Sequence, residues 1–200
     1  MTETMTAVAY TRSLPIDDPA SLTDVVVDVP AVRPRDLLVE VRAVSVNPVD
    51  VKVRAGNDPQ GEPKVLGFDA AGVVRAVGAD VTMFAPGDEV YYAGDIGRPG
   101  TDSQFHAVDE RIVAKKPTTL DFAQAAALPL TVITAWEGLF DKLRITAETT
   151  GTLLMVGATG GVGSVVLQLL RTLVPGVRAI ATAAGEDAVE WVRSLGAAEV

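Results

Sequence analysis

The clearest hydrophobic pattern in the chain lies at residues 152–173. Leu153 to Val156, led by Thr152, form an apolar run of a length that suits a short buried strand. Four glycines then fall between Gly157 and Gly163. Beyond them apolar residues recur at helical spacing, at Val165, Val166, Leu169, Leu170 and Leu173. The pattern predicts a strand, a tight turn and a helix, in that order.

Short apolar runs separated by turn residues fill the first part of the chain. They predict strands at Met5–Tyr10, Val25–Val29, Asp36–Val46, Gly67–Val77, Glu89–Tyr92, Phe105–Val108 and Ile112–Lys115. The alternation of DLLVEVRAVSV is typical of a half-buried antiparallel strand. Pro48 suits the first position of a helix. Many short strands with turns between them predict a barrel-like all-β unit.

The pattern changes near Pro117. Residues 120–143 are rich in alanine and have helical spacing, with an interruption at Pro129. After the glycine stretch come a strand, Val177–Thr182, and a helix, Glu186–Leu195. This alternation predicts an α/β unit with a parallel sheet. We place the boundary between Thr118 and Leu130, with domains at 1–124 and 125–200.

A strand, a glycine turn and a helix together indicate a dinucleotide site, because glycine lets the backbone approach a pyrophosphate and the helix N-terminus offers free N–H groups. The pattern is A-x-G-x-x-G rather than G-x-G-x-x-G. The candidate cofactor-binding residues of this turn are Gly157, Ala158, Gly160, Gly161, Val162 and Gly163. A buried strand and helix without a ligand is one alternative. A membrane span over the uncharged residues 149–170 is another, which the internal glycines and hydroxyls oppose.

Composition narrows the classes of partner and chemistry. The formal net charge of −9 and the scattered basic residues argue against nucleic acid. The chain has no cysteine, which removes disulfides and thiolate zinc sites. We interpret the single histidine, His106, as structural or exposed. The first residues lack a basic region followed by an apolar core, so we expect no signal peptide and a cytoplasmic protein.

Five motifs occur in an order and spacing shared with one known group of proteins. They are SVNPVD (residues 45–50), GFDAAGVV (67–74), PGDEVYYAG (86–94), AAALPLTVITAW (125–136) and VGATGGVGS (156–164). In these motifs the chain resembles the medium-chain dehydrogenase/reductase superfamily, and in particular its zinc-independent quinone oxidoreductase and zinc-type alcohol dehydrogenase-like branch. The resemblance implies a GroES-like β-barrel domain followed by the first half of a Rossmann fold.

The resemblance also implies roles for individual residues. Asn47 would lie at the catalytic cleft and donate to a substrate carbonyl, although an Asn-Pro pair also simply forms turns. Phe68 and Tyr92 would wall the substrate pocket, or belong to the core. Thr131 and Thr134 would lie near the nicotinamide, or act as a helix cap and a core hydroxyl. Zinc-dependent relatives carry ligands near Asn47 and at Phe68, so we expect no zinc.

The segment at the end of the predicted strand Val177–Thr182 bears on the choice between NAD(H) and NADP(H). NAD-preferring sites commonly place an acid about 20 residues after the glycine motif. Here Thr182 and Ala183 occupy that place, and Glu186 and Asp187 open the next helix. Thr182 and Ala183 join the candidate cofactor-binding residues. We therefore expect NADP(H) rather than NAD(H), although no lysine or arginine lies between Thr182 and Trp191.

Together with the missing acid after the strand at 177–182, the resemblance thus implies a zinc-independent, NADPH-dependent oxidoreductase that transfers a hydride to a quinone, an enone or a related activated carbonyl. The alternatives are a non-catalytic NADP(H)-binding or redox-sensing module and an inactive fragment of a larger reductase. The Rossmann fold is only half present before Val200, so we expect a C-terminally truncated chain with exposed apolar sheet edges. The full-length family form would be a homodimer acting on small molecules, with no nucleic-acid or membrane partner.

Overall fold

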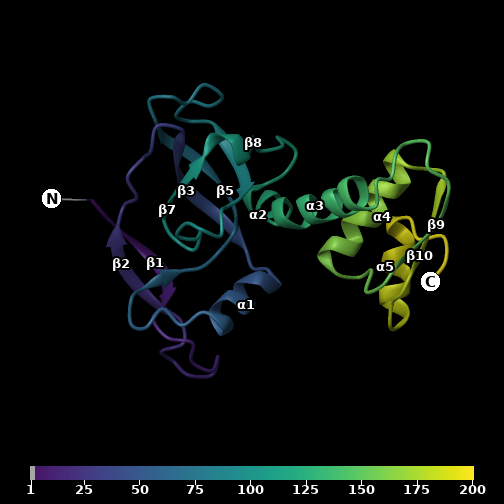
Figure 1. The fold of residues 1–200 in the computed structure, drawn as a ribbon, viewed down its shortest axis with the longest axis horizontal. Helices are drawn as coiled ribbons and strands as arrows, with labels where there is room; N and C mark the ends of the chain where they lie inside the picture. The colour runs from purple at the N-terminus through teal and green to yellow at the C-terminus, as the bar shows by residue number, and fades with distance from the viewer. Residues whose placement is uncertain (1–2) are drawn as a thin grey trace. The chain divides into compact units, whose positions relative to one another are not determined.

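The computed structural model describes residues 3–200, which form two compact units, one reaching to Leu130 and the other Thr131–Val200 (Figure 1). Met1 and Thr2, the start of the expected first domain, lie outside the described residues. The division between the units lies a few residues beyond the expected boundary at 124. Ala125 and Ala126 belong to the first unit because they are buried in a cluster with its Ala71. The functional domain limits 1–124 and 125–200 stay a prediction.

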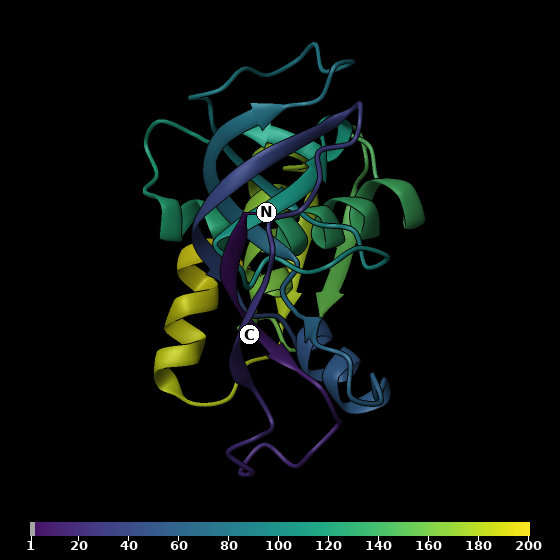
Figure 2. The ribbon, with the colours of Figure 1, turned by 90° about the vertical axis from the view of Figure 1, so that its left-hand side faces the viewer.

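Two antiparallel sheets make up the first unit (Figure 2). The smaller has the order β2-β1-β4, from β1 (Thr4–Tyr10), β2 (Thr23–Asp28) and β4 (Lys64–Val65). The larger has the order β7-β3-β5-β6-β8, from β3 (Asp36–Ser45), β5 (Asp69–Val77), β6 (Glu89–Ala93), β7 (Phe105–Asp109) and β8 (Val113–Lys115). The predicted β-barrel domain is confirmed, and only the short strand β4 was not anticipated.

The core of this unit follows from the alternation along the strands. Leu37 and Val39 of β3 point inward and are fully buried. They pack in one cluster with apolar residues of the neighbouring strands, namely Ala70, Val74, Val90, Tyr92, Val108 and Val113. Because successive strand residues face opposite sides, one sequence pattern supplies both the core and the solvent-facing surface.

Three short helical segments complete the first unit. They are α1 (Pro48–Gly56), a 3-10 turn at Glu110–Ile112 and α2 (Phe122–Ala126). Pro48 takes the first helical position, as predicted. The strand expected to begin at Gly67 begins at Asp69 instead. Gly67 has φ +97°, a left-handed conformation that a strand does not contain.

The second unit alternates helices and strands. Its elements are α3 (Pro129–Trp136), a π-helical turn (Glu137–Lys142), β9 (Gly151–Met155), α4 (Gly161–Leu173), β10 (Val177–Ala181) and α5 (Glu186–Leu195). Strands β9 and β10 are parallel. Glu199 forms a further parallel bridge with Ile180. The predicted partial Rossmann fold is confirmed.

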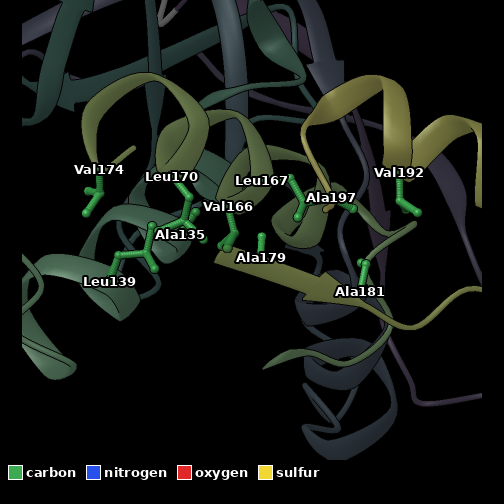
Figure 3. Packing of buried hydrophobic residues seen from close by; sticks show 11 residues of the cluster. Ala135, Leu139, Val166, Leu167, Leu170, Val174, Ala179, Ala181, Val192 and Ala197 are labelled. Carbon is green, nitrogen blue, oxygen red and sulfur yellow. The ribbon is translucent and has the colours of Figure 1, made fainter. Parts of the chain in front are cut away.

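One face of this small sheet is covered and carries the core of the unit. Val166, Leu167 and Leu170 of α4 lie near Ala179 of β10 (Figure 3). The other side chains of this cluster include Ala135, Leu139, Ala158, Val174, Ala181, Val192 and Ala197. In contrast, Leu154 and Val156 are 60% and 70% exposed, so apolar side chains at β9 remain uncovered. No helix within residues 3–200 is long and apolar enough to cross a membrane.

Candidate active site and cofactor site

Asn47 begins helix α1 and is 5% exposed. Its backbone N–H donates to Asp50 Oδ2 at 2.7 Å, which satisfies a polar group at the start of the helix. The other carboxylate oxygen of Asp50 accepts from the N–H of Gly67 at 3.2 Å. Asp50 therefore stabilises the Asn-Pro turn.

The side-chain amide of Asn47 is engaged within the protein. Its Nδ2 donates to Asp69 Oδ2 at 2.9 Å and to the backbone oxygen of Ser45 at 3.3 Å. The predicted donation to a substrate carbonyl therefore competes with two internal acceptors. The longer of the two bonds, to Ser45, is the weaker and the easier to replace.

Asp69 is a site residue that the sequence reasoning missed. It is the first residue of β5 and is fully buried. Besides the bond to Asn47, its Oδ1 accepts from the backbone N–H of Leu130 at 2.9 Å, and its backbone oxygen accepts from Thr101 Oγ1 at 3.1 Å. The sequence did contain a signal for Asp69, which is an acid near the start of the otherwise apolar run GFDAAGVV. A carboxylate that is buried with such a strand needs hydrogen-bond partners.

The electrostatic setting of Asp69 follows from this burial. The pKa of Asp69 is raised to about 6. Desolvation by burial is the largest cause; the hydrogen bonds from Asn47 and Leu130 lower the pKa, and the charge of Asp50 raises it. The pKa of Asp102 is likewise raised to about 6, by burial first and by the charge of Asp50 second. The charge of Asp50 thus raises the pKa of both Asp69 and Asp102.

Phe68 and Tyr92, the predicted pocket walls, lie in different surroundings. Phe68 is half-buried in the turn before β5, and its backbone oxygen accepts from the N–H of Gly94 at 2.6 Å. Tyr92 is 2% exposed, belongs to the barrel core and contacts His106 through its hydroxyl. A cavity of about 380 Å³ in this unit is lined by His106 among others, but by neither Phe68 nor Tyr92. Their role as pocket walls stays a prediction.

The contact between Tyr92 and His106 fixes the state of the imidazole. Nε2 lies 3.1 Å from the backbone oxygen of Pro99, an acceptor, so Nε2 carries the hydrogen. Nδ1 then accepts from the Tyr92 hydroxyl at 3.0 Å. Burial lowers the pKa of His106 to about 4 and raises that of Tyr92. Both side chains are neutral near pH 7 and hold strands β6 and β7 to the core.

The glycine turn between β9 and α4 has a different requirement at each position. Gly157 has φ +66°, a conformation that favours glycine. A Cβ on Gly163 would lie 2.6 Å from the backbone of Ala158, so only glycine allows α4 to approach the turn this closely. A Cβ on Gly161 would lie 2.9 Å from Thr131 Cγ2, which places Thr131 against the turn. A Cβ on Gly160 would meet only the oxygen of Gly157, at 3.6 Å, an ordinary van der Waals contact, so the fold itself does not exclude a side chain there.

Thr182 supports this turn. Its hydroxyl accepts from the N–H of Gly157 at 2.8 Å, and its backbone oxygen accepts from the N–H of Ala158 at 3.2 Å. Ala183 and Val162 are half-buried and pack against the core of the unit. The structure therefore brings most of the predicted cofactor residues together around one turn.

The donor set fits a dinucleotide phosphate. Helix α4 has 13 residues and no acid in its first turn, so its N-terminal N–H groups favour an anion. Glu186 and Asp187 lie in the first turn of α5, as predicted. For a metal the fit is poor: residues 3–200 contain no group of three or more His, Cys, Asp or Glu side chains arranged to hold an ion.

Comparison with known proteins finds one matching family model and several similar proteins. Residues 33–118 match the family described as alcohol dehydrogenase GroES-like domain. A zinc-type alcohol dehydrogenase-like protein of Staphylococcus epidermidis is 39% identical over 96% of this chain and 58% of its own length. The 2-methylene-furan-3-one reductase of Solanum lycopersicum is 39% identical over 86% of this chain and 45% of its own length. The chain thus spans about half the length of these relatives.

Solved structures of similar proteins superpose well on this chain. A Rhizobium etli CFN 42 protein, described as a candidate zinc-dependent alcohol dehydrogenase, superposes with a TM-score of 0.93 at 53% identity, over 100% of this chain and 59% of that chain. A quinone oxidoreductase of Coxiella burnetii gives 0.84 at 27% identity, over 98% and 62% of the two chains. A mycobacterial protein complexed with NADPH gives 0.80 at 28% identity, over 98% and 58% of the two chains.

The fold and the glycine turn define a GroES-like domain joined to part of a dinucleotide-binding fold, the architecture of the medium-chain dehydrogenases/reductases. Among the relatives with this architecture, the chain is similar to zinc-type alcohol dehydrogenase-like proteins and to quinone oxidoreductases. These homologues are oxidoreductases.

Proposed function

We propose that the chain is the substrate- and cofactor-binding part of a zinc-independent, NADPH-dependent oxidoreductase that reduces an enone, a quinone or a related activated carbonyl. The observation that carries the proposal is the glycine turn at the N-terminus of α4, where a Cβ on Gly160 would have only the oxygen of Gly157 within 4 Å and the first helical turn has no acid. The relatives named as an enone reductase and as a quinone oxidoreductase support the substrate class.

The residues of the turn would hold the cofactor through its pyrophosphate. Gly160 allows close approach, the first N–H groups of α4 donate to the phosphate oxygens, and Gly163 lets the helix reach the turn. NADPH, when bound, supplies a hydride. Reduction of an enone needs that hydride at carbon and one proton, which solvent water provides. Thr131, which packs against Gly161, is the candidate neighbour of the nicotinamide.

Asn47 is the proposed catalytic residue. Its amide would donate to the carbonyl oxygen of the acceptor and stabilise the negative charge that develops there. The bond to Asp69, at 2.9 Å, holds the amide in one orientation. The hydrogen now directed at Ser45, at 3.3 Å, is the one that a substrate oxygen would take over.

The preference for NADPH over NADH rests on the end of β10. Thr182 and Ala183 provide no carboxylate to bind a ribose 2′-hydroxyl or to repel a 2′-phosphate. The hydroxyl of Thr182 is directed at the N–H of Gly157. Zinc independence rests on the donor set, because Asn47 and Phe68 present an amide and a phenyl ring where zinc-dependent relatives would have ligands.

Titration with NADPH tests binding, and a panel of enones and quinones tests turnover. Trp191 lies close to the turn, since its Nε1 donates to Ser164 Oγ at 3.2 Å, so its emission should report binding. We expect NADPH to bind more tightly than NADH and the turnover to persist in EDTA. Equal or tighter binding of NADH, or loss of activity in EDTA, would contradict the corresponding part of the proposal.

A non-catalytic NADP(H)-binding module is the second candidate. It is favoured by the two internal acceptors that already occupy the amide of Asn47. Binding of NADPH without turnover of any acceptor, both in the 200-residue chain and in any longer reading frame, would support this candidate. A homodimer is the oligomer we propose for a complete enzyme of this kind, and size-exclusion chromatography tests it.

A further inference from the structure

The residues at the start of helix α3 are not of the types that usually cap a helix. Pro129 takes the first helical position and has no N–H, and the residue before it is Leu128. Leu128 cannot accept a hydrogen bond through its side chain as a Ser, Thr, Asp or Asn cap would. The first turn of α3 also contains no acid.

The carboxylate of Asp69 supplies such an acceptor from a distant part of the chain. Its Oδ1 accepts from the N–H of Leu130 at 2.9 Å, although the two residues are 61 positions apart. This N–H belongs to the first turn of α3, where helical N–H groups have no intrahelical partner. Asp69 thus caps α3 as an N-cap side chain would, but from strand β5.

The second oxygen of the same carboxylate is bonded to the candidate catalytic residue. Oδ2 accepts from Asn47 Nδ2 at 2.9 Å, and Asp69 is fully buried. One rigid group therefore joins the start of α1 to the start of α3.

We propose that Asp69 is a positioning residue, which holds the turn that carries Asn47 and the N–H of Leu130 in one fixed arrangement within the first unit. It acts as a hydrogen-bond acceptor, through Asn47 and Leu130, and not by contact with a reactant. The consequence for catalysis rests on the proposed function, whereas the tie itself does not.

Three variants test whether Asp69 acts as a hydrogen-bond acceptor, rather than through its charge or through general stability. Asp69→Ala removes both acceptor oxygens. Asp69→Asn keeps the shape and one acceptor oxygen, which can still accept from Leu130. Asp102→Ala is the matched control, because it removes another partly buried acid whose pKa is also raised, but which has no bond to Leu130.

Hydrogen exchange of the Leu130 amide, followed by NMR on the whole 200-residue chain, measures the tie directly. We expect Asp69→Ala to speed this exchange by about ten-fold or more, and the other two variants to stay within about three-fold of the wild type. Unchanged exchange in Asp69→Ala would overturn the proposal. Equal acceleration of the exchange in Asp69→Asn would show that the charge of Asp69 is what matters. Equal acceleration in Asp102→Ala would show a general loss of stability. Either result would also overturn the proposal.

Turnover supplies the readout that a purely structural role would not produce. In an active enzyme, Asp69→Ala should lower kcat by about ten-fold with little change in the KM for the acceptor, and Asp69→Asn should restore most of kcat. An unchanged kcat in Asp69→Ala would overturn the link to catalysis. If the wild type itself shows no turnover, the proposed function fails, while the exchange experiment still decides whether Asp69 ties α3.

Discussion

The Nδ2 of Asn47 lies 2.9 Å from Oδ2 of Asp69, and both side chains are buried. The residue predicted to donate to a substrate is therefore also an internal donor. Its partner carboxylate is bonded in turn to the start of helix α3. A group that orients Asn47 so firmly reduces the entropy lost when a substrate binds, and it also makes the amide sensitive to changes at Asp69.

The first prediction concerns the pH dependence of stability. Because the pKa of Asp69 is raised to about 6, the folded state binds more protons than the unfolded state between about pH 4 and pH 6, and this group lowers stability as pH rises through that range. Asp69→Asn removes this contribution. The free energy of unfolding of the variant relative to the wild type should therefore rise by about 2–3 kcal/mol between pH 4 and pH 7.

Urea denaturation at both pH values measures this difference, with circular dichroism as the probe. The contributions of Asp102 and His106 are shared by both proteins and cancel in the comparison. A difference that does not change with pH would show that Asp69 titrates normally.

The second prediction contrasts two glycines of the cofactor turn. Gly163→Ala should destabilise the second unit by about 1–3 kcal/mol or more, because the new Cβ would lie 2.6 Å from the backbone of Ala158. Gly160→Ala meets only the oxygen of Gly157 at 3.6 Å and should cost less than about 1 kcal/mol. The same methyl would occupy the space over the turn and should weaken NADPH binding by about ten-fold or more.

Thermal unfolding and NADPH titration of the two variants give both quantities. Tight binding of NADPH by Gly160→Ala would place the pyrophosphate elsewhere. A stable Gly163→Ala would contradict the close packing of α4 against the turn.

The third prediction concerns the pair in the barrel core. Tyr92→Phe removes the hydroxyl that donates to His106 Nδ1 at 3.0 Å and leaves a buried acceptor without its donor. We expect a loss of about 1–3 kcal/mol of unfolding free energy. Tyr91→Phe, on the neighbouring and less buried position of β6, is the control and should change stability little. Equal effects of the two substitutions would contradict the structural role of the Tyr92 hydroxyl.

The fourth prediction concerns the uncovered side chains at β9. Leu154 is 60% exposed, whereas Leu153, its neighbour on the opposite face, packs against the core. Leu154→Ser should reduce self-association with little loss of stability, and Leu153→Ser should lower the melting temperature. Light scattering and thermal unfolding distinguish the two outcomes. Unchanged association in Leu154→Ser would exclude this face as its cause.

The imidazole of His106 illustrates a limit of the sequence. The sequence supplied one histidine in a predicted strand, and it left open whether the side chain was structural or exposed. The structure shows a buried ring between the Tyr92 hydroxyl and the backbone oxygen of Pro99, at 3.0 and 3.1 Å. Neither partner could be found from spacing along the chain, because both contacts depend on how β6, β7 and the loop at Pro99 pack.

Local sequence patterns predicted most of the strands and helices and the class of each unit. Alternation along DLLVEVRAVSV predicted strand β3, and the order of apolar run, glycines and apolar helix predicted β9, the turn and α4. These features are local, since side-chain periodicity and the conformational freedom of glycine act over a few residues. The tertiary structure alone decided that Asp69 would join Asn47 to Leu130. That carboxylate meets partners 22 and 61 positions away, and only the packing of β5 against the starts of α1 and α3 brings their donors to its two oxygens.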